Sequence, residues 1–139
     1  MADLKRLKPK VRRLADRLAL KCAEEGIAIN ITCGYRSILE QDKLYSIGRT
    51  APGKKVTNAR GGQSFHNFGV AFDFCPLVRG KPCWTDLRLF DRVGKIGKSL
   101  GLEWGGDWIK FPDLPHFEYT AGYCLKDFQA NKVDWNRFE

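Results

Sequence analysis

Hydrophobic residues recur at helical spacing near the start of the chain, with lysine and arginine between them. Pro9 suits the first turn of a helix, and Gly26 is a typical stop signal. The spacing predicts an amphipathic helix over about residues 8–25, with an apolar stripe that packs on a domain core. A membrane surface is the alternative contact for a basic amphipathic helix. The periodic positions are Leu4, Leu7, Val11, Leu14 and Leu18.

Residues 27–33 alternate and are rich in β-branched side chains, which predicts a strand. The strand leads into Gly34-Tyr35-Arg36-Ser37. Ser37 has Glu40 three residues after it, a capping-box pattern, so a helix is expected over about residues 38–47. Residues 48–63 contain Gly, Lys and Arg without an apolar period. Long loops in compact domains are commonly functional, and we expect this one to border an active site.

A second strand is predicted over residues 70–75. Alternation places Ala71, Asp73 and Cys75 on one face, and Val70, Phe72 and Phe74 on the other. The apolar set is expected to face the core. Asp73 is then expected to face a cleft.

The pattern after residue 75 alternates between strand and helix signals. A hairpin is predicted to turn at Arg79–Gly80. Thr85 is the expected N-cap of a helix over about residues 86–100, which Gly101 ends. The buried stripe of this helix is expected at Leu89, Val93, Ile96 and Leu100.

The last third of the chain predicts shorter elements. Residues 102–108 form a glycine-containing aromatic loop, residues 116–119 a short strand, and residues 125–130 a helical turn. No internal repeat or linker interrupts the pattern. We therefore expect one α+β domain over residues 1–139, a small antiparallel sheet with helices packed on one side.

Composition narrows the class of protein. With 43% hydrophobic residues the chain suits a globular fold, and no apolar run approaches the roughly 20 residues of a membrane span. Its basic N-terminus lacks the apolar core and cleavage site of a signal peptide. The five cysteines are odd in number and form no Cys-x-x-Cys pair, so neither a disulfide framework nor a four-cysteine zinc site is expected. These features predict synthesis in a cytosol.

The formal net charge is +8. Such a surface suits a polyanion, which includes nucleic acid, an anionic membrane surface and an acidic cell-wall polymer. A solvated basic face without a specific partner is equally compatible with this charge. Nucleic acid is disfavoured, because no helix combines a dense basic stripe with base-reading residues and no DNA-binding motif is present.

Only two histidines occur in the chain, and each has a carboxylate nearby in sequence. A catalytic zinc site usually has three protein ligands and one open position for water. His66, Asp73 and His116 would supply two imidazoles and a carboxylate. Asp113 is the candidate general base, and Glu118 is its rival. Packed or surface histidines are the alternative, because the two lie 50 residues apart.

The pattern Ser64-x-His66-x6-Asp73, followed by Asp113-x-x-His116, resembles the zinc D-alanyl-D-alanine carboxypeptidase family, which contains VanY-like and L-alanyl-D-glutamate peptidases. It is similar in particular to the compact phage endolysins of that family. The resemblance covers most of the chain. Its anchors are Gly34-Tyr35-Arg36-Ser37, the stretch from Ser64 to Asp73, Leu102-Glu103-Trp104-Gly105-Gly106-Asp107-Trp108, and Pro115-His116-Phe117-Glu118.

This resemblance implies roles for individual residues. It implies zinc ligation by His66, Asp73 and His116, and an acidic general base at Asp113, where many relatives carry the longer Glu. It also places Arg36 in the groove, where a cation stabilises an oxyanion.

For other residues the alternatives stay open. Ser64 is expected to bind substrate, to orient a ligand or to form a turn. Trp104 and Trp108 are expected to line the groove or to fill the core. Asp107 is expected either to cap the loop or to hydrogen-bond a ligand histidine. Cys75 is an alternative metal ligand with a softer donor atom.

The fold implied by the resemblance is hedgehog/DD-peptidase-like. The implied function is a zinc-dependent peptidase that cleaves the L-alanyl-D-glutamate bond of the peptidoglycan stem peptide, as a phage or prophage endolysin for host lysis. We expect a monomer without stable membrane insertion, made in the host cytoplasm and acting in the periplasm or cell wall after release. The alternatives are a D-alanyl-D-alanine carboxypeptidase and a non-catalytic, zinc-containing wall-binding module.

Overall fold

An antiparallel sheet forms the centre of the protein. The structure, a computed structural model, describes residues 2–139. The strand order is β1-β2-β5-β4, and β3 pairs with the far end of β2. The bounds are Ala28–Cys33 for β1, Ala71–Val78 for β2, Lys81–Pro82 for β3, Glu103–Trp104 for β4 and His116–Glu118 for β5. The predicted strands are present, and β4 was not predicted because two residues are too few to show a period.

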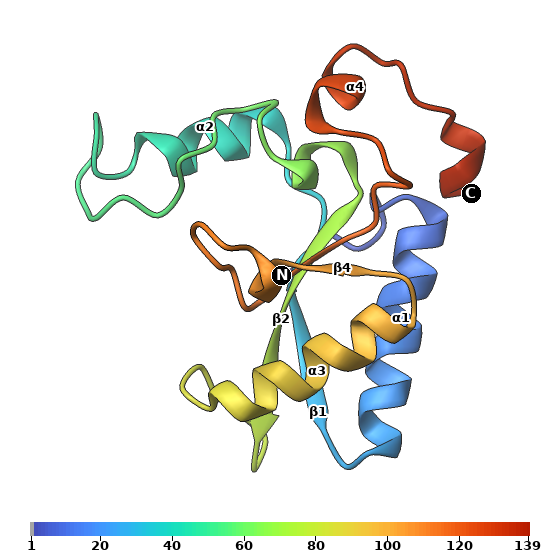
Figure 1. Ribbon diagram of the computed structural model, residues 1–139. Helices are drawn as coiled ribbons and strands as arrows, with labels where there is room; N and C mark the ends of the chain where they lie inside the picture. Colours follow the sequence, from blue (N-terminus) through green and yellow to red (C-terminus); the bar gives the residue numbers. More distant parts are fainter. Residues whose placement is uncertain (1) are drawn as a thin grey trace.

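Two helices cover one face of this sheet. Helix α1 (Pro9–Glu24) contacts β1 and α3, and helix α3 (Leu87–Ser99) contacts β4. Figure 1 shows α3 crossing the sheet, with α1 beside it. The core between these layers contains buried side chains from both helices and from the inner face of β2 and β5, among them Leu14, Leu18, Phe72, Phe74, Phe90, Val93 and Phe117. The expected α+β fold, with helices on one side of an antiparallel sheet, is confirmed.

Two glycines let α3 approach the sheet closely. A methyl group at Gly94 would overlap the ring of Trp104, and one at Gly97 would overlap the ring of Phe117. The predicted stripe of α3 was therefore partly wrong. Phe90 and the two glycines occupy buried positions, whereas Leu89 and Leu100 are only partly buried. A stripe assigned from hydrophobicity alone misses glycines that make room for aromatic rings.

The N-cap of α3 was also predicted at the wrong residue. Asp86, not Thr85, precedes the helix, and its Oδ1 accepts a hydrogen bond from the Leu89 backbone N–H at 3.1 Å. At the other end Gly101 has φ +95°, the left-handed conformation expected after a helix. The hairpin at Arg79–Gly80 is confirmed, with both residues at positive φ.

Helix α2 (Ile38–Ser46) lies apart from the two packed helices. Its predicted capping box is present, because Ser37 and Glu40 exchange hydrogen bonds. Figure 1 shows α2 and the loop after it extending away from α1 and α3. In the loop over residues 48–63 no helix or strand is assigned, as expected. This part of the molecule forms one side of the cleft described below.

The C-terminal segment closes the other end of the core. The predicted helical turn is α4 (Leu125–Gln129), and a 3-10 turn, η3 (Trp135–Phe138), follows it. Phe128 and Phe138 are buried, and Phe128 stacks edge-on against Phe65, just before the first histidine. Among residues 2–139, no helix is both long and apolar enough to span a membrane.

Candidate active site

Three polar side chains lie side by side on the sheet face opposite the helices. In the strand register, Cys33 of β1 is the partner of Asp73 in β2, and Asp73 is the partner of His116 in β5. The neighbours Phe72 and Phe117 pair on the core face. The period of two in each strand therefore puts the aromatic rings into the core and this polar row into the cleft. The predicted orientation of Asp73 is confirmed.

His66 reaches this row from a short 3-10 helix, η1 (Phe65–Phe68), which leads into β2. Ser64 is its N-cap, and the Ser64 hydroxyl accepts a hydrogen bond from the His66 N–H at 3.3 Å. The Asn67 side chain accepts the backbone N–H of Ser64 in return at 3.2 Å. Gly69 ends the turn at φ +73°, close to the backbone of Arg6, where a side chain would clash. Ser64 thus has the turn-forming role that was one of its alternatives.

The three residues expected as ligands converge on one point. Asp73 Oδ1 lies 3.2 Å from His66 Nε2 and 3.2 Å from His116 Nδ1. The two imidazole rings meet edge to face, with centroids 5.2 Å apart. Both histidines are buried, whereas 23% of the Asp73 side chain remains exposed. Two nitrogens and an oxygen therefore face a common, partly open position.

Each imidazole is held by a hydrogen bond on its other nitrogen. His66 Nδ1 lies 2.8 Å from the carbonyl oxygen of Gly34, to which it donates. His116 Nε2 lies 2.7 Å from Oε1 of the buried Glu118 and donates to it. These acceptors fix the tautomers, so the lone pairs of His66 Nε2 and His116 Nδ1 point toward Asp73. Metal-binding histidines in proteins have this outer hydrogen bond almost without exception.

The electrostatics of the site fit a bound cation. Burial would lower the pKa of His66, but the hydrogen bonds and charges of Asp73 and Cys33 outweigh it and raise the pKa to about 10. Burial would raise the pKa of Asp73, but its two histidine partners hold it well below its ordinary value. The negative charge of Asp73 that raises the pKa of His66 would attract a metal ion in the same way. Two imidazoles and a carboxylate are the donor set of a catalytic zinc with an open position.

Cys33 is a further candidate donor beside the two histidines. The ligand atoms of Cys33, His66 and Asp73 all lie within 4.8 Å of one another. However, the Cys33 Sγ contact of 3.8 Å is to His66 Nδ1, the nitrogen that faces away from Asp73. His116 is therefore the better third candidate ligand, because its Nδ1 and His66 Nε2 both lie 3.2 Å from Asp73 Oδ1. Cys75 is buried in β2, with its thiol directed to the carbonyl of Pro76.

Asp113 stands at the entrance to this site. It precedes β5 by three residues, and its backbone is tied by hydrogen bonds from its own N–H to Gly105 O at 2.9 Å and from His116 N–H to its carbonyl at 3.2 Å. Burial raises the pKa of its carboxyl above the ordinary value. Glu118, the rival base, is instead engaged with the outer nitrogen of His116. The geometry favours Asp113 as the proton carrier.

Arg36 lines the same small cavity, of about 360 Å³, as His66, Asp73 and Asp113. Its guanidinium contacts Gln41 Oε1 at 2.8 Å and Cys33 Sγ at 3.1 Å. Its backbone N–H donates to the carbonyl of His66 at 3.1 Å. The expected cation is therefore adjacent to the candidate metal position.

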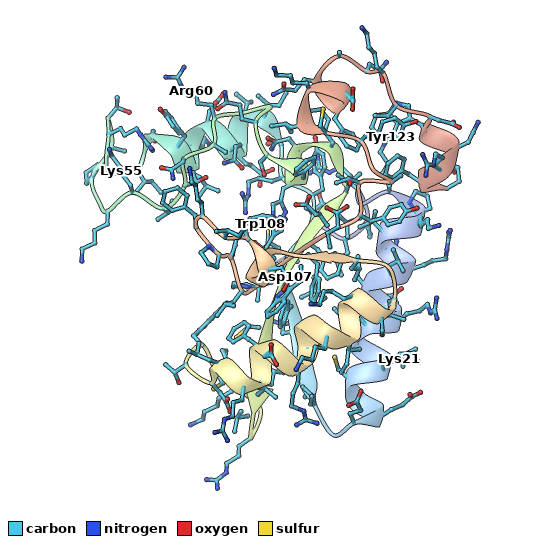
Figure 2. All side chains as sticks on the ribbon, in the orientation of Figure 1. Lys21, Lys55, Arg60, Asp107, Trp108 and Tyr123 are labelled. Atoms are coloured by element: carbon cyan, nitrogen blue, oxygen red, sulfur yellow. The ribbon has the colours of Figure 1, made fainter. Side chains whose placement is uncertain are left out.

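A wider cleft of about 670 Å³ opens from the metal position between two loops. Thr57 and Ala59 line it on the α2 side, and Trp108 and Phe111 line it on the other. Figure 2 shows Trp108 between the loop that carries Lys55 and the segment that carries Asp107. The Trp108 ring also contacts the ring of His116, with centroids 5.0 Å apart. The long loop borders this cleft as expected.

The two tryptophans of the aromatic loop have different surroundings. Trp104, expected to bind substrate, is only 6% exposed and is not among the residues that line the cleft. Its Nε1 donates to the carbonyl of Leu114 at 2.8 Å, so it holds the turn that carries Asp113. Asp107 forms an ion pair with Lys98 at 3.0 Å rather than supporting a histidine. The geometry favours Trp108 over Trp104 as the substrate-contacting ring.

A family model described as D-alanyl-D-alanine carboxypeptidase matches residues 57–119, which include His66, Asp73 and His116. The peptidoglycan L-alanyl-D-glutamate endopeptidase CwlK of Bacillus subtilis (strain 168) is 43% identical over 127 residues, covering 81% of this chain and 72% of the relative. The chain belongs to the D-alanyl-D-alanine carboxypeptidase family. This confirms the resemblance inferred from the two histidine segments.

Two more comparisons show similarity to part of a phage peptidase and to the fold of a solved structure. The L-alanyl-D-glutamate peptidase of Listeria phage A118 is 40% identical over 70 residues, covering 48% of this chain and 25% of the phage protein. The structure of Serratia marcescens L-Ala D-Glu endopeptidase ChiX superposes with a TM-score of 0.64 at 23% identity, covering 91% of this chain and 86% of that one. At that identity the superposition supports the fold alone.

Sequence reasoning missed two residues that the site uses. Cys33 was assigned only to the end of a strand, and its position opposite Asp73 depends on a register shift between Ile31 and Cys33. Glu118 was considered only as a base. Its spacing of two from His116 on a strand already placed both side chains on one face, which was the available signal for an ion pair.

Proposed function

We propose that this protein is a zinc-dependent peptidase that hydrolyses the L-alanyl-D-glutamate bond of the peptidoglycan stem peptide. Its place in the family and its similarity to CwlK and to the phage peptidase support the activity. The proposal depends on one observation: Asp73 Oδ1 lies 3.2 Å from the inward-facing nitrogen of each histidine. His66, Asp73 and His116 would hold the ion. When bound, zinc lowers the pKa of its water to about 7 and polarises a carbonyl group.

The remaining steps belong to the side chains around that position. The Asp113 carboxylate accepts a proton from the attacking water as the water oxygen bonds to the L-alanyl carbonyl carbon. It then gives that proton to the nitrogen of D-glutamate as the C–N bond breaks. Burial raises the pKa of Asp113, which makes its carboxylate a stronger base. Arg36 stabilises the negative charge that develops on the carbonyl oxygen.

The surroundings of the cleft suit an anionic peptide. Trp108 and Phe111 offer apolar surface at one wall, and the opposite loop carries Lys54 and Lys55. The carboxylates of the stem peptide would be attracted by this positive charge and by the net charge of +8. We further propose that the chain acts as a monomer at the cell wall after synthesis in a cytoplasm, and that a lytic role in phage release is one setting for it.

Mass analysis of digested peptidoglycan tests this function. Purified sacculi treated with the zinc-loaded protein should release peptides with a new D-glutamate amino terminus. Loss of single D-alanine residues instead would establish the carboxypeptidase alternative. Excess chelator should abolish cleavage, and added zinc should restore it. Binding to sacculi without any new terminus would establish the non-catalytic wall-binding alternative.

A further inference from the structure

Helix α2 buries a single side chain, and that side chain is an amide. Gln41 is fully buried, whereas the other residues of α2 are exposed or only partly buried. All of its polar atoms are used. Oε1 accepts a hydrogen bond from Arg36 Nη1 at 2.8 Å, and Nε2 donates to Ala59 O at 2.8 Å and to Thr57 Oγ1 at 3.4 Å. A buried amide is retained at such a position only when its hydrogen bonds are made, because an unpaired one is costly.

The first of these contacts fixes the guanidinium of Arg36. Gln41 holds Nη1, and Cys33 Sγ contacts Nη2 at 3.1 Å, so two nitrogens of one planar group have partners on different elements. A planar fork held at two points has a defined orientation. The group lines the cavity that contains His66 and Asp113. The orientation of the cation in that cavity therefore depends on the amide.

The second set of contacts fixes a wall of the cleft. Thr57 and Ala59 both line the wide cleft, and they belong to a loop in which no helix or strand is assigned. Arg49 also helps to hold this loop, because its guanidinium donates a hydrogen bond to the carbonyl of Thr57 at 3.1 Å. Gln41 is nevertheless the residue that joins this loop to Arg36. One amide thus links the cation beside the metal position to the loop against which a peptide would lie.

We propose that Gln41 is a positioning residue that sets both the Arg36 guanidinium and the loop at residues 57–59 for hydrolysis. This inference rests on the proposed function of the cleft. The acceptor oxygen of Gln41 acts on the chemical step through Arg36. The donor nitrogen acts on substrate binding through the loop. The two ends of one side chain therefore have separable effects on kcat and KM.

Two substitutions separate these effects. Gln41→Met keeps the side-chain volume and removes both the amide oxygen and the amide nitrogen. The Arg36 guanidinium then loses its fixed position, so kcat should fall about 10- to 100-fold, as expected when a catalytic group is misplaced by about 1 Å. Gln41→Glu keeps an acceptor for Arg36 but places a carboxylate against the carbonyl of Ala59, so KM should rise while kcat stays near the wild-type value. Thr120→Val is the matched control, because Thr120 is another buried polar residue and the change removes its hydrogen bond to Glu103. It should lower the Tm similarly and leave kcat unchanged.

A double substitution tests whether Gln41 acts through Arg36. In an Arg36→Ala background, Gln41→Met should cause no further loss of kcat, since the group it orients is gone. Independent multiplicative losses would overturn the proposal, as would a Gln41→Met enzyme whose kcat and KM match those of Thr120→Val. If the wild-type protein produces no D-glutamate terminus, the proposed function itself fails, a distinct outcome.

A readout without substrate examines the same contact directly. NMR of the arginine side chains should show slow rotation of the Arg36 guanidinium in the zinc-loaded wild type. Rotation should be fast in Gln41→Met and still slow in Gln41→Glu and Thr120→Val. Equal rotation in wild type and Gln41→Met would overturn the proposal, whatever the activities.

Discussion

Glu118 lies against the edge of the His116 ring that faces away from Asp73. Its Oε1 is 2.7 Å from His116 Nε2, whereas Asp73 Oδ1 is 3.2 Å from Nδ1 on the inner edge. Strand β5 produces this arrangement by itself, because residues two apart share a face. The buried carboxylate keeps the proton on Nε2 and leaves the lone pair of Nδ1 available to a metal ion. Glu118 is thus placed to orient a ligand rather than to carry the catalytic proton.

Replacement of this carboxylate should weaken metal binding. We expect Glu118→Gln to lower zinc affinity about 10- to 100-fold, the usual effect of losing an outer hydrogen-bond partner of a ligand histidine. Competition with a chelator of known affinity measures this change. Glu103→Gln is a matched control, because Glu103 is the register partner of Glu118 on β4 but is exposed. Equal zinc affinity of Glu118→Gln and wild type would contradict the assigned role.

Asp113 should be needed for hydrolysis and not for zinc binding. Asp113→Asn removes the proton acceptor but keeps the shape, so kcat should fall about 10²- to 10⁴-fold with zinc affinity unchanged. Asp107→Asn, an exposed carboxylate in the preceding loop, should keep full activity. Activity and zinc content are measured on the same preparations. A fully active Asp113→Asn enzyme would return the role of base to Glu118.

The sequence predicted most of the scaffold because its signals are local. The capping box at Ser37, the turn at Gly80 and the alternation around Asp73 each depend on neighbouring residues, and all three are present. The predictions of the N-cap of α3, which is Asp86 and not Thr85, and of the buried stripe of that helix were less accurate. Both depend on competition between adjacent candidates, or on rings that arrive from another strand.

His66, Asp73 and His116 were predictable as candidate ligands because histidine is rare in this chain and the motif is specific. The residues that hold these candidate ligands in place were harder to predict. Cys33 and Gln41 acquire their roles from strand register, or from contacts with residues distant in sequence. The spacing of two between Glu118 and His116 was the one local signal. For Trp104 both groove contact and a place in the core were open from the sequence. Packing against Gly94 decided for the core.

The metal-free protein should lose stability as pH rises above neutral. Burial lowers the pKa of His66, but the hydrogen bonds and charges of Asp73 and Cys33 outweigh burial. The pKa is therefore raised to about 10 in the folded protein, from 6.5 in the unfolded chain. A raised pKa in the folded state stabilises the protein fully below about pH 6.5, and this contribution is lost as pH rises toward 10. The Tm in excess chelator should therefore fall over this range.

Zinc should reverse this trend, because the ion competes with the same protons. The increase in Tm on adding zinc should grow from pH 5 to pH 8, and binding should release protons into a weakly buffered solution. Asp73→Asn removes the partner that raises the histidine pKa, so its metal-free Tm should depend less on pH. A metal-free Tm that rises between pH 6.5 and 10 would contradict the proposed electrostatics.

Trp104 should act on catalysis through the turn that it holds. Trp104→Phe keeps the ring against Gly94 but removes the Nε1 donor to Leu114 O, which should cost about 1 kcal/mol of stability. The turn carries Asp113, so kcat should fall several-fold while KM stays unchanged, because the ring does not line the cleft. Trp135→Phe is the matched control, since its Nε1 donates to Asn131 in the C-terminal segment. Denaturant unfolding and steady-state kinetics measure both effects, and a raised KM with normal kcat would show that Trp104 contacts substrate after all.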